Sequence, residues 1–265
     1  MIPSEPISSL RGSIDFDGGV WLAAKLVKSP STIRMVDEDA LIAHIRFPVL
    51  SRLPAIIARL RRVFDLAVDP EAINDHLLRD ASLAPLIAAR PGLRAPGGWN
   101  GFELAVRAVL GQQITVRAAI GLAGELVKRY GETAPPSTTG DVRLTHAFPR
   151  AERMASDDLT LGMPPSRVRA LRGLASAVTD DPNLLGMGRS LEEAVDRLKA
   201  LPGIGEWTAQ YIALRGMREP DAFPAADVGL LRALADEAGL RPTAAQLLER
   251  AEAWRPWRAY AAQHL

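Results

Sequence analysis

The chain has 265 residues, of which 48% are hydrophobic and 24% charged, and its formal net charge is +1. This length suits one large domain or about two to three small ones with a sizeable core. There are no cysteines, which excludes disulfides, zinc–thiolate sites and iron–sulfur clusters. The sequence has neither an apolar run of about 18 residues nor an apolar leader, so we expect a soluble, cytoplasmic protein with no membrane partner. A charge this close to zero neither demands nor excludes a nucleic-acid partner.

The four histidines do not predict a metal site. His44, His76, His146 and His264 are far apart in sequence, and none forms a metal-binding spacing. A lone histidine is far more often a surface or core residue than a ligand. We therefore expect that no cofactor is required.

The N-terminal part predicts two pairs of strands within residues 8–47. In the first pair, LRGSIDF and VWLAAKLV flank a turn at 17–19, and in the second, TIRMV and LIAHIRF flank a turn at 37–39. Beyond this part the pattern becomes helical. We predict a small N-terminal α/β domain with an antiparallel sheet over 1–78 and a helical body over 79–265.

The helical pattern begins with LPAIIARLRRVFDL, whose apolar residues recur at spacings of three and four at Leu53, Ile56, Ile57, Leu60 and Phe64. Residues 101–130 are periodic but interrupted at GQQIT, so Gly111 is expected to end one helix and Thr115 to start the next. Further helices are predicted at about 165–179, 190–200, 206–216, 228–238, 243–253 and 257–264.

The most informative segment is RLKALPGIGEWTAQYIALRGMREPDAFPAADVGLLR, at 197–232. One helix is expected to end near Ala200 and the next to start near Glu206, and the tight turn between them needs Gly203 and Gly205. Backbone N–H groups at such a turn can bind a DNA phosphate with few cationic side chains. The motif alone is also compatible with an ordinary connection between two helices.

Asp227 follows AFPAA and precedes VGLLRALADEA, which begins a helix. Aspartate is a preferred residue for capping a helix, and a capping role is compatible with catalysis, since the helix start would hold the carboxylate while it faces a cleft.

LPGIGEWTAQYIALRG followed by FPAADVGLLRAL resembles the helix-hairpin-helix DNA glycosylases, whose catalytic aspartate follows the hairpin. Within that superfamily the chain is most similar to the bacterial inducible 3-methyladenine DNA glycosylase II family. Other segments agree with that family in order and spacing, so the resemblance covers about residues 48–265. They are LRRVFDL, ARPGLRAPG, FELAVRAVLGQQITV, AFPRAERMA, LGMPPSRVRAL and WRPWRAYAAQHL. It implies a mainly α fold whose helical body has two lobes, about 102–219 and 79–101 plus 220–265, with DNA in the cleft between them.

The resemblance also implies an activity and its residues. The activity is that of a monofunctional glycosylase, working as a monomer on double-stranded DNA, that hydrolyses the N-glycosidic bond of alkylated purines such as 3-methyladenine and 7-methylguanine. The residues implied are Asp227 as catalytic carboxylate, Trp207 and Tyr211 in the base pocket, Gly203 and Gly205 at the DNA backbone, Gln113 as the wedge that fills the gap left by a flipped base, and the carbonyls of Lys199, Leu201 and Ile204 around a Na⁺ or K⁺ ion. Trp207 stands where lyase-competent relatives carry a lysine nucleophile, which argues against Schiff-base chemistry.

Some features depart from the family pattern. The N-terminal domain is expected to be shorter than usual, and Val228 follows Asp227 where the best-known member of the family has an aromatic residue. Two alternatives therefore stay open: a non-catalytic binder of damaged DNA, and a glycosylase for another base such as hypoxanthine. Trp254, Trp257 and Tyr260 form a second aromatic stripe, and its two tryptophans are expected to pack in the core.

Overall fold

The computed structural model describes residues 32–265 apart from 38–39, 45–49, 134–144, 187–189 and 237. The first expected strand pair, before residue 28, lies outside the described residues. The second is confirmed: β1 (Thr32–Asp37) and β2 (Ala40–His44) pair antiparallel, with Thr32 opposite His44. A 3₁₀ turn, η1 (Leu50–Arg52), leads into α2 (Leu53–Val63).

From α2 onward the chain is mostly helical, as expected, and side-chain caps mark the start of some of the helices, among them α6 and α11. The elements in chain order are α3 (Pro70–Leu77), α4 (Ala84–Ala89), α5 (Gly101–Leu110), α6 (Val116–Tyr130), α7 (Ala151–Ser156), α8 (Pro165–Asp180), α9 (Leu191–Lys199), α10 (Glu206–Ile212), the π-helical η2 (Ala213–Met217), α11 (Val228–Ala233), α12 (Ala244–Ala251), the 3₁₀ turn η3 (Glu252–Trp254) and α13 (Arg258–His264). The side chain of Thr115 caps α6 by accepting a hydrogen bond from the Ala118 N–H, which confirms the predicted start.

Two details differ from the sequence-based expectation. The helix expected over 228–238 ends at Ala233, because Asp236 and Gly239 form a tight loop there: the Asp236 side chain accepts a hydrogen bond from the Leu240 N–H at 2.8 Å, and Gly239 has a φ of 80°. A short antiparallel pair, β3 (Glu132–Thr133) and β4 (His146–Ala147), was not expected. The early end of α11 depends on local turn chemistry rather than on apolar periodicity.

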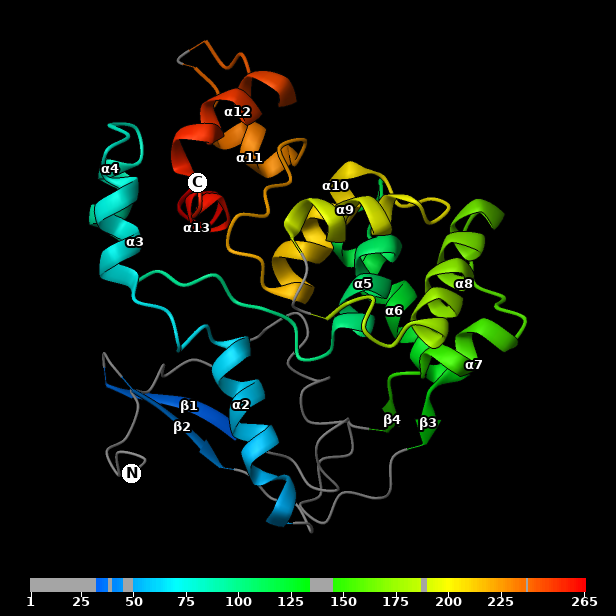
Figure 1. Cartoon of the computed structure of the whole chain (residues 1–265). Helices are drawn as coiled ribbons and strands as arrows, with labels where there is room; N and C mark the ends of the chain where they lie inside the picture. The colour runs from blue at the N-terminus through cyan, green and yellow to red at the C-terminus, as the bar shows by residue number, and fades with distance from the viewer. Residues whose placement is uncertain (1–31, 38–39, 45–49, 134–144, 187–189, 237) are drawn as a thin grey trace.

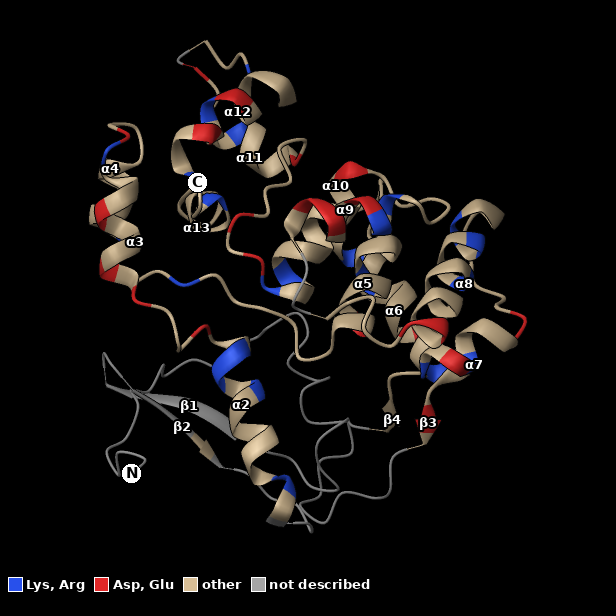
Figure 2. Ribbon diagram, in the orientation of Figure 1, with Lys and Arg blue, Asp and Glu red and all other residues tan. Residues whose placement is uncertain are grey.

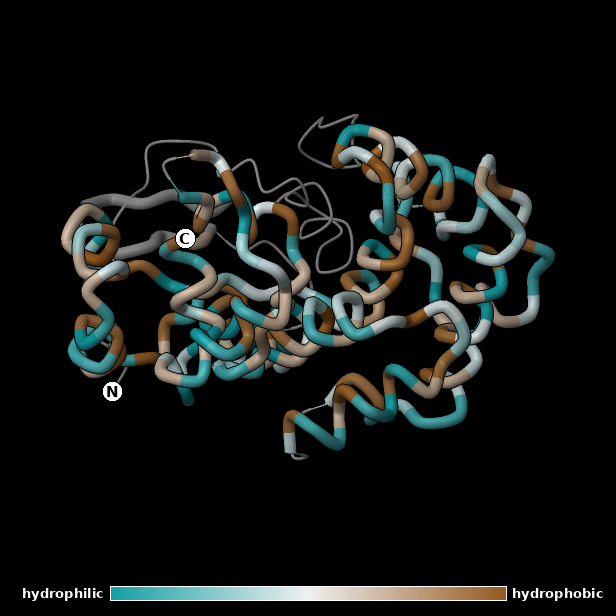
Figure 3. The backbone as a smooth tube through the Cα atoms, turned by 90° about the horizontal axis from the view of Figure 1, so that it is seen from above, coloured by the Kyte–Doolittle hydropathy of each residue, from teal (hydrophilic) through white to brown (hydrophobic). Residues whose placement is uncertain are grey.

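The helices form two groups that face each other in Figure 1, α5 to α10 on one side and α3, α4 and α11 to α13 on the other. α3 and α4 lie beside the C-terminal helices although the two are distant in sequence: the Trp254 indole N–H donates to Asp80 at 2.7 Å, and Arg90 donates to the His264 carbonyl. Hydrophobic and hydrophilic residues alternate along the helical stretches (Figure 3), as amphipathic helices require.

The hydrophobic core does not divide at residue 78. Ile73 and Leu77 belong to the same large buried cluster as α5 to α13, whereas Ile56, Val63 and Trp99 form a small separate cluster under α2. The domain boundary at 78 and the two lobe ranges therefore stay predictions. Among the described residues no helix is long and apolar enough to cross a membrane.

One buried carboxylate, Asp65, joins segments from both groups. Its side chain accepts hydrogen bonds from the Tyr260 hydroxyl at 2.7 Å and the Ala95 N–H at 3.0 Å, and Arg218 at the end of η2 donates to its other oxygen. Burial and the bond to Asp65 raise the pKa of Tyr260, so its hydroxyl stays protonated and donates at neutral pH. This junction fixes α13 and η2 relative to the end of α2.

Candidate active site

A cleft of about 1500 Å³ runs between the two groups of helices. Its walls come from the segment before α5, from α5 itself, from the loop before α6, from the hairpin between α9 and α10, and from the start of α11. The lining includes the candidates Gln113, Gly203, Gly205, Trp207, Tyr211 and Asp227. Residues that the sequence places far apart thus meet in one cavity of a size suited to a nucleobase and its sugar.

Asp227 is held by two hydrogen bonds at the N-terminus of α11. Its Oδ1 accepts from the Gly229 N–H at 2.7 Å, which confirms that Asp227 caps this helix. Its Oδ2 accepts from the Trp207 indole Nε1–H at 2.9 Å. Each carboxylate oxygen has a lone pair left after its one protein bond, so the group can also accept a hydrogen bond from water.

Trp207 and Tyr211 lie one turn apart on α10 and form a stacked pair. Their ring centroids are 5.3 Å apart and their planes are inclined by 18°. Both side chains are half-buried in the cleft wall. The face that these rings present is electron-rich, and a positively charged ring is attracted to such a face.

The sequence did not identify Arg215, which also lines the cleft. It continues the spacing of four from Trp207 and Tyr211, and that regularity is the signal that could have revealed it. Its Nη1 donates to the Pro96 carbonyl at 2.9 Å. Burial lowers the pKa of the Arg215 guanidinium, while Tyr211 and Asp227 nearby act in the opposite direction. Asp227 is near enough to Arg215 for their opposite charges to attract, so Arg215 offsets part of the negative potential of Asp227.

The hairpin between α9 and α10 has two glycines with different physical roles. Gly203 has a φ of 79°, and a Cβ there would lie 2.7 Å from the Cβ of Ala170, so both its conformation and its packing require glycine. Gly205, at the start of α10, has a φ of −91° and open space where a Cβ would be. The backbone of Gly205 is exposed at the rim of the cleft.

The loop 111–115 lies against this hairpin. The Gln112 amide donates to the Gly203 carbonyl at 2.9 Å and to the Thr208 hydroxyl at 3.0 Å, while Arg167 donates to the Gln112 carbonyl at 2.7 Å. Gln113 has a left-handed φ of 57° and an exposed side chain at the cleft. The structure therefore brings the two segments expected to contact DNA into direct contact with each other.

The carbonyl-bearing residues Lys199, Leu201 and Ile204 lie in one turn at the end of α9. The Leu201 carbonyl accepts a hydrogen bond from the Ile204 N–H at 3.2 Å, and the Lys199 ammonium is 2.7 Å from a Glu206 carboxylate oxygen. No group of three or more histidine, aspartate or glutamate side chains able to hold a metal occurs in the described part of the chain. Any cation here would depend on backbone oxygens.

The aromatic stripe near the C-terminus does not contribute to the cleft. Trp254 is 1% exposed and packs edge-on against Phe223, and Trp257 packs edge-on against Tyr260. This confirms the expectation that Trp254 is a core residue.

Comparison with known proteins finds a matching family model and similar sequences. A family model described as the AlkA N-terminal domain matches residues 22–100. The chain is 43% identical over 209 residues to a probable bifunctional transcriptional activator/DNA repair enzyme AlkA of Mycobacterium tuberculosis, covering 78% of this chain but 41% of that protein, so it spans less than half of the relative's length. It is 38% identical over 213 residues to DNA-3-methyladenine glycosylase 2 of Escherichia coli, covering 79% of this chain and 70% of that one.

Solved structures show the same fold at lower identity. A 3-methyladenine DNA-glycosylase from Archaeoglobus fulgidus superposes with a TM-score of 0.72 at 21% identity, covering 88% of this chain and 80% of that one. An 8-oxoguanine glycosylase/lyase from Clostridium acetobutylicum superposes with a TM-score of 0.68 at 17% identity, covering 94% and 90%. The 38% identity to DNA-3-methyladenine glycosylase 2, which covers 70% of that protein, places the chain in the AlkA (DNA-3-methyladenine glycosylase 2) family, and the solved structures share its fold.

Proposed function

We propose that the chain is a monofunctional DNA glycosylase that hydrolyses the N-glycosidic bond of alkylated purines, 3-methyladenine and 7-methylguanine among them, in base excision repair. The observation that carries the proposal is the Asp227 carboxylate, fixed by the Trp207 indole inside a cleft large enough for a flipped nucleotide. We propose that it acts on double-stranded DNA, as a monomer and in the cytoplasm.

The chemistry asked of Asp227 is electrostatic and basic. A purine alkylated at N3 or N7 carries positive charge, so its glycosidic bond is already weakened and the leaving base needs little protonation. As the bond breaks, its electron pair goes to the base and positive charge develops on the sugar, which a fixed carboxylate stabilises. Water then adds its oxygen to C1′, and Asp227 accepts the proton. The lone pairs left on its two oxygens provide for this step.

The stacked pair Trp207 and Tyr211 supports recognition of the base. A flipped purine carrying positive charge gains from contact with an electron-rich aromatic face, and neutral purines gain less. A tryptophan at 207 also leaves no lysine there to attack the sugar, which favours hydrolysis by water over lyase chemistry. The charge of Arg215 limits how much cation attraction the pocket offers.

The hairpin and the loop 111–115 are proposed to hold the DNA. The open space at Gly205 permits a phosphate to approach the backbone N–H groups at the start of α10, and Gln113 projects from the facing loop as the wedge. The surrounding charges are mixed: Figure 2 shows basic and acidic residues interspersed over both groups of helices. Binding through backbone N–H groups suits a chain with a net charge of +1.

A monovalent cation at the hairpin is the remaining proposal. Lys199, Leu201 and Ile204 lie in one turn at the C-terminal end of α9, and backbone carbonyl oxygens are donors that Na⁺ and K⁺ accept. An ion bound by these carbonyls would stiffen the hairpin and add positive potential beside the DNA, and no covalent step depends on it.

The test is release of bases from alkylated DNA, identified by mass spectrometry, for the wild type and Asp227→Asn. Asparagine keeps the shape and retains one acceptor oxygen for the Gly229 N–H, but it removes the charge. We expect it to fold and bind DNA, yet to lose about two or more orders of magnitude in excision rate, the scale of one electrostatic group.

Asp236→Asn is the matched control, because Asp236 also accepts a backbone N–H bond, at 2.8 Å from Leu240, but lies in an exposed loop that does not line the cleft. It should excise at the wild-type rate. Excision by Asp227→Asn at near that rate would refute the role of Asp227. Release of hypoxanthine alone would refute the proposed substrate. DNA binding without release of any base would show that the protein is a non-catalytic binder.

A further inference from the structure

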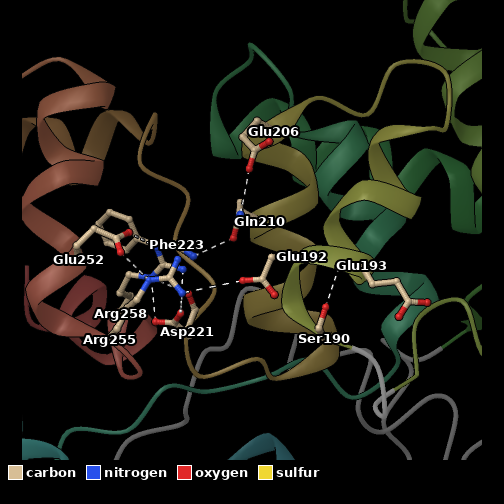
Figure 4. Close-up of polar contacts among 10 residues, drawn as sticks. All are labelled: Ser190, Glu192, Glu193, Glu206, Gln210, Asp221, Phe223, Glu252, Arg255 and Arg258. Atoms are coloured by element: carbon tan, nitrogen blue, oxygen red, sulfur yellow. Dashed lines mark hydrogen bonds and ion pairs between the residues drawn. The ribbon is translucent and has the colours of Figure 1, made fainter.

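The segment from Arg218 to Ala226 leads from η2 to Asp227 and is attached to both groups of helices. On the C-terminal side, the Arg258 guanidinium donates to both carboxylate oxygens of Asp221 at 2.8 and 2.9 Å, and Arg255 lies 3.0 Å from the same carboxylate. On the other side, the Phe223 N–H donates to the Gln210 amide oxygen at 3.0 Å. Figure 4 shows Gln210 reaching from α10 toward Phe223 while the two arginines approach Asp221 from the C-terminal helices.

The orientation of the Gln210 amide is determined by its second hydrogen bond. Its Nε2 donates to the Glu206 carboxylate at 3.0 Å, and the other oxygen of Glu206 is 2.7 Å from the Lys199 ammonium. The bonds from Lys199 and Gln210 lower the pKa of Glu206, so it is a carboxylate and acts only as an acceptor at neutral pH. A flipped amide would set its oxygen against that carboxylate and its NH₂ against the Phe223 N–H. The oxygen of Gln210 therefore points to Phe223.

The chain between Phe223 and Asp227 transmits this attachment over a short distance. Phe223 is 2% exposed, the Ala225 N–H donates to the Phe223 carbonyl at 2.9 Å, and the Asp227 N–H donates to the Pro224 carbonyl at 2.8 Å. Two backbone bonds in five residues leave little freedom between the anchor and the carboxylate. A shift of Phe223 relative to α10 is therefore passed on to Asp227.

We propose that Gln210 is a positioning residue for Asp227. It holds the segment before Asp227 against α10, the same helix whose Trp207 holds the carboxylate directly, so that α10 fixes Asp227 at two points. This inference rests on the proposed function, because positioning has a consequence only if Asp227 is catalytic. Without Gln210, the Asp221 anchor still ties the segment to α13, and only the Trp207 bond and packing relate it to the base pocket.

The experiment uses single-turnover excision from alkylated duplex DNA at saturating enzyme, so that changes in affinity do not enter the rate. Gln210→Leu removes both bonds and should lower the rate about tenfold, the cost of a slightly misplaced group. Gln210→Glu sets two carboxylates where an amide N–H and a carboxylate meet at 3.0 Å, and should lower it at least as much. The double variant Glu206→Gln with Gln210→Glu restores a donor facing an acceptor and an acceptor for Phe223, and should recover most of the rate.

Three further measurements separate positioning from a general loss of structure. Affinity for duplex DNA should change less than twofold in Gln210→Leu. Gln246→Leu is the matched control, since Gln246 accepts a backbone N–H bond from Thr243 at 2.9 Å on α12, outside the cleft lining; it should leave the rate unchanged. In an Asp227→Asn background Gln210→Leu should have no further effect, because it acts through that carboxylate.

The outcomes also separate this inference from the proposed function. A wild type that releases no base refutes the proposed function. If the wild type is active, any one of three results overturns the positioning role alone. These are a wild-type rate in Gln210→Leu, a double variant that is no faster than Gln210→Glu, and full additivity of Gln210→Leu with Asp227→Asn.

Discussion

Trp207→Phe is the substitution that best divides recognition of the base from orientation of the carboxylate. Phenylalanine keeps a ring for the stack on Tyr211 but removes the indole N–H that donates to Asp227 at 2.9 Å. A hydrogen bond to a charged group contributes about 1.5–3 kcal/mol, and since Trp207 is half-buried we take the lower part of that range, about 1.5–2 kcal/mol. At about 1.4 kcal/mol per factor of ten, the single-turnover excision rate should fall roughly 10- to 30-fold.

The affinity of Trp207→Phe for DNA should stay near that of the wild type. Trp207→Ala, which also removes the stack on Tyr211, should lower the excision rate more than Trp207→Phe does. In Trp207→Ala the excision rate should also fall more than the affinity for DNA. Trp254→Phe is the matched control, because its indole also donates to a carboxylate, Asp80, at 2.7 Å, away from the cleft, and phenylalanine keeps a ring to pack against Phe223. It should lower the free energy of unfolding and leave the rate per folded molecule unchanged. A wild-type rate in Trp207→Phe would mean that the bond to Asp227 is incidental, and equal losses of rate and affinity in Trp207→Ala would argue against a pocket role.

Two further predictions concern the DNA contacts. Gly203→Ala should lower the free energy of unfolding by about 1–3 kcal/mol in urea titrations, since it combines a left-handed φ with a clash against Ala170. Gly205→Ala should leave stability unchanged and weaken binding to the same extent for DNA of any sequence. A loss of binding that depends on the DNA sequence would contradict phosphate contact. Gln113→Gly should relieve a φ of 57° without lowering the melting temperature, yet slow excision from paired duplex more than from a lesion placed opposite a mismatch. An equal effect on both substrates would remove Gln113 from the wedge role.

Features governed by local chemistry could be predicted from the sequence. Thr115 and Asp227 do cap the helices that begin after them, Gly203 does adopt a positive φ, and β1 and β2 do pair antiparallel. Each depends on a few neighbouring residues whose preferences are strong. The family resemblance extended this local knowledge to the presence of a two-lobed helical body.

Contacts between distant segments could not be predicted in the same way. Arg215 reaches the Pro96 carbonyl across 119 residues, and Gln112 reaches the Gly203 carbonyl across 91. Polar side chains of this kind carry no periodicity, and their partners are backbone carbonyls, which every residue has. Which carbonyl is near depends on how the helices pack, so such contacts emerge only with the fold.

The bond between Trp207 and Asp227 changes how removal of the charge at 227 must be interpreted. Asparagine at 227 can keep its oxygen toward the Gly229 N–H only by turning its NH₂ toward the Trp207 indole N–H, which sets two donors against each other. Asp227→Asn therefore removes a charge and also loses the contact that orients the group, so its rate loss overstates the electrostatic part. In a Trp207→Phe background that donor is absent, and the further loss on Asp227→Asn measures the charge alone. The difference between the two losses is the coupling between pocket and carboxylate, which the geometry of α10 requires to be greater than zero.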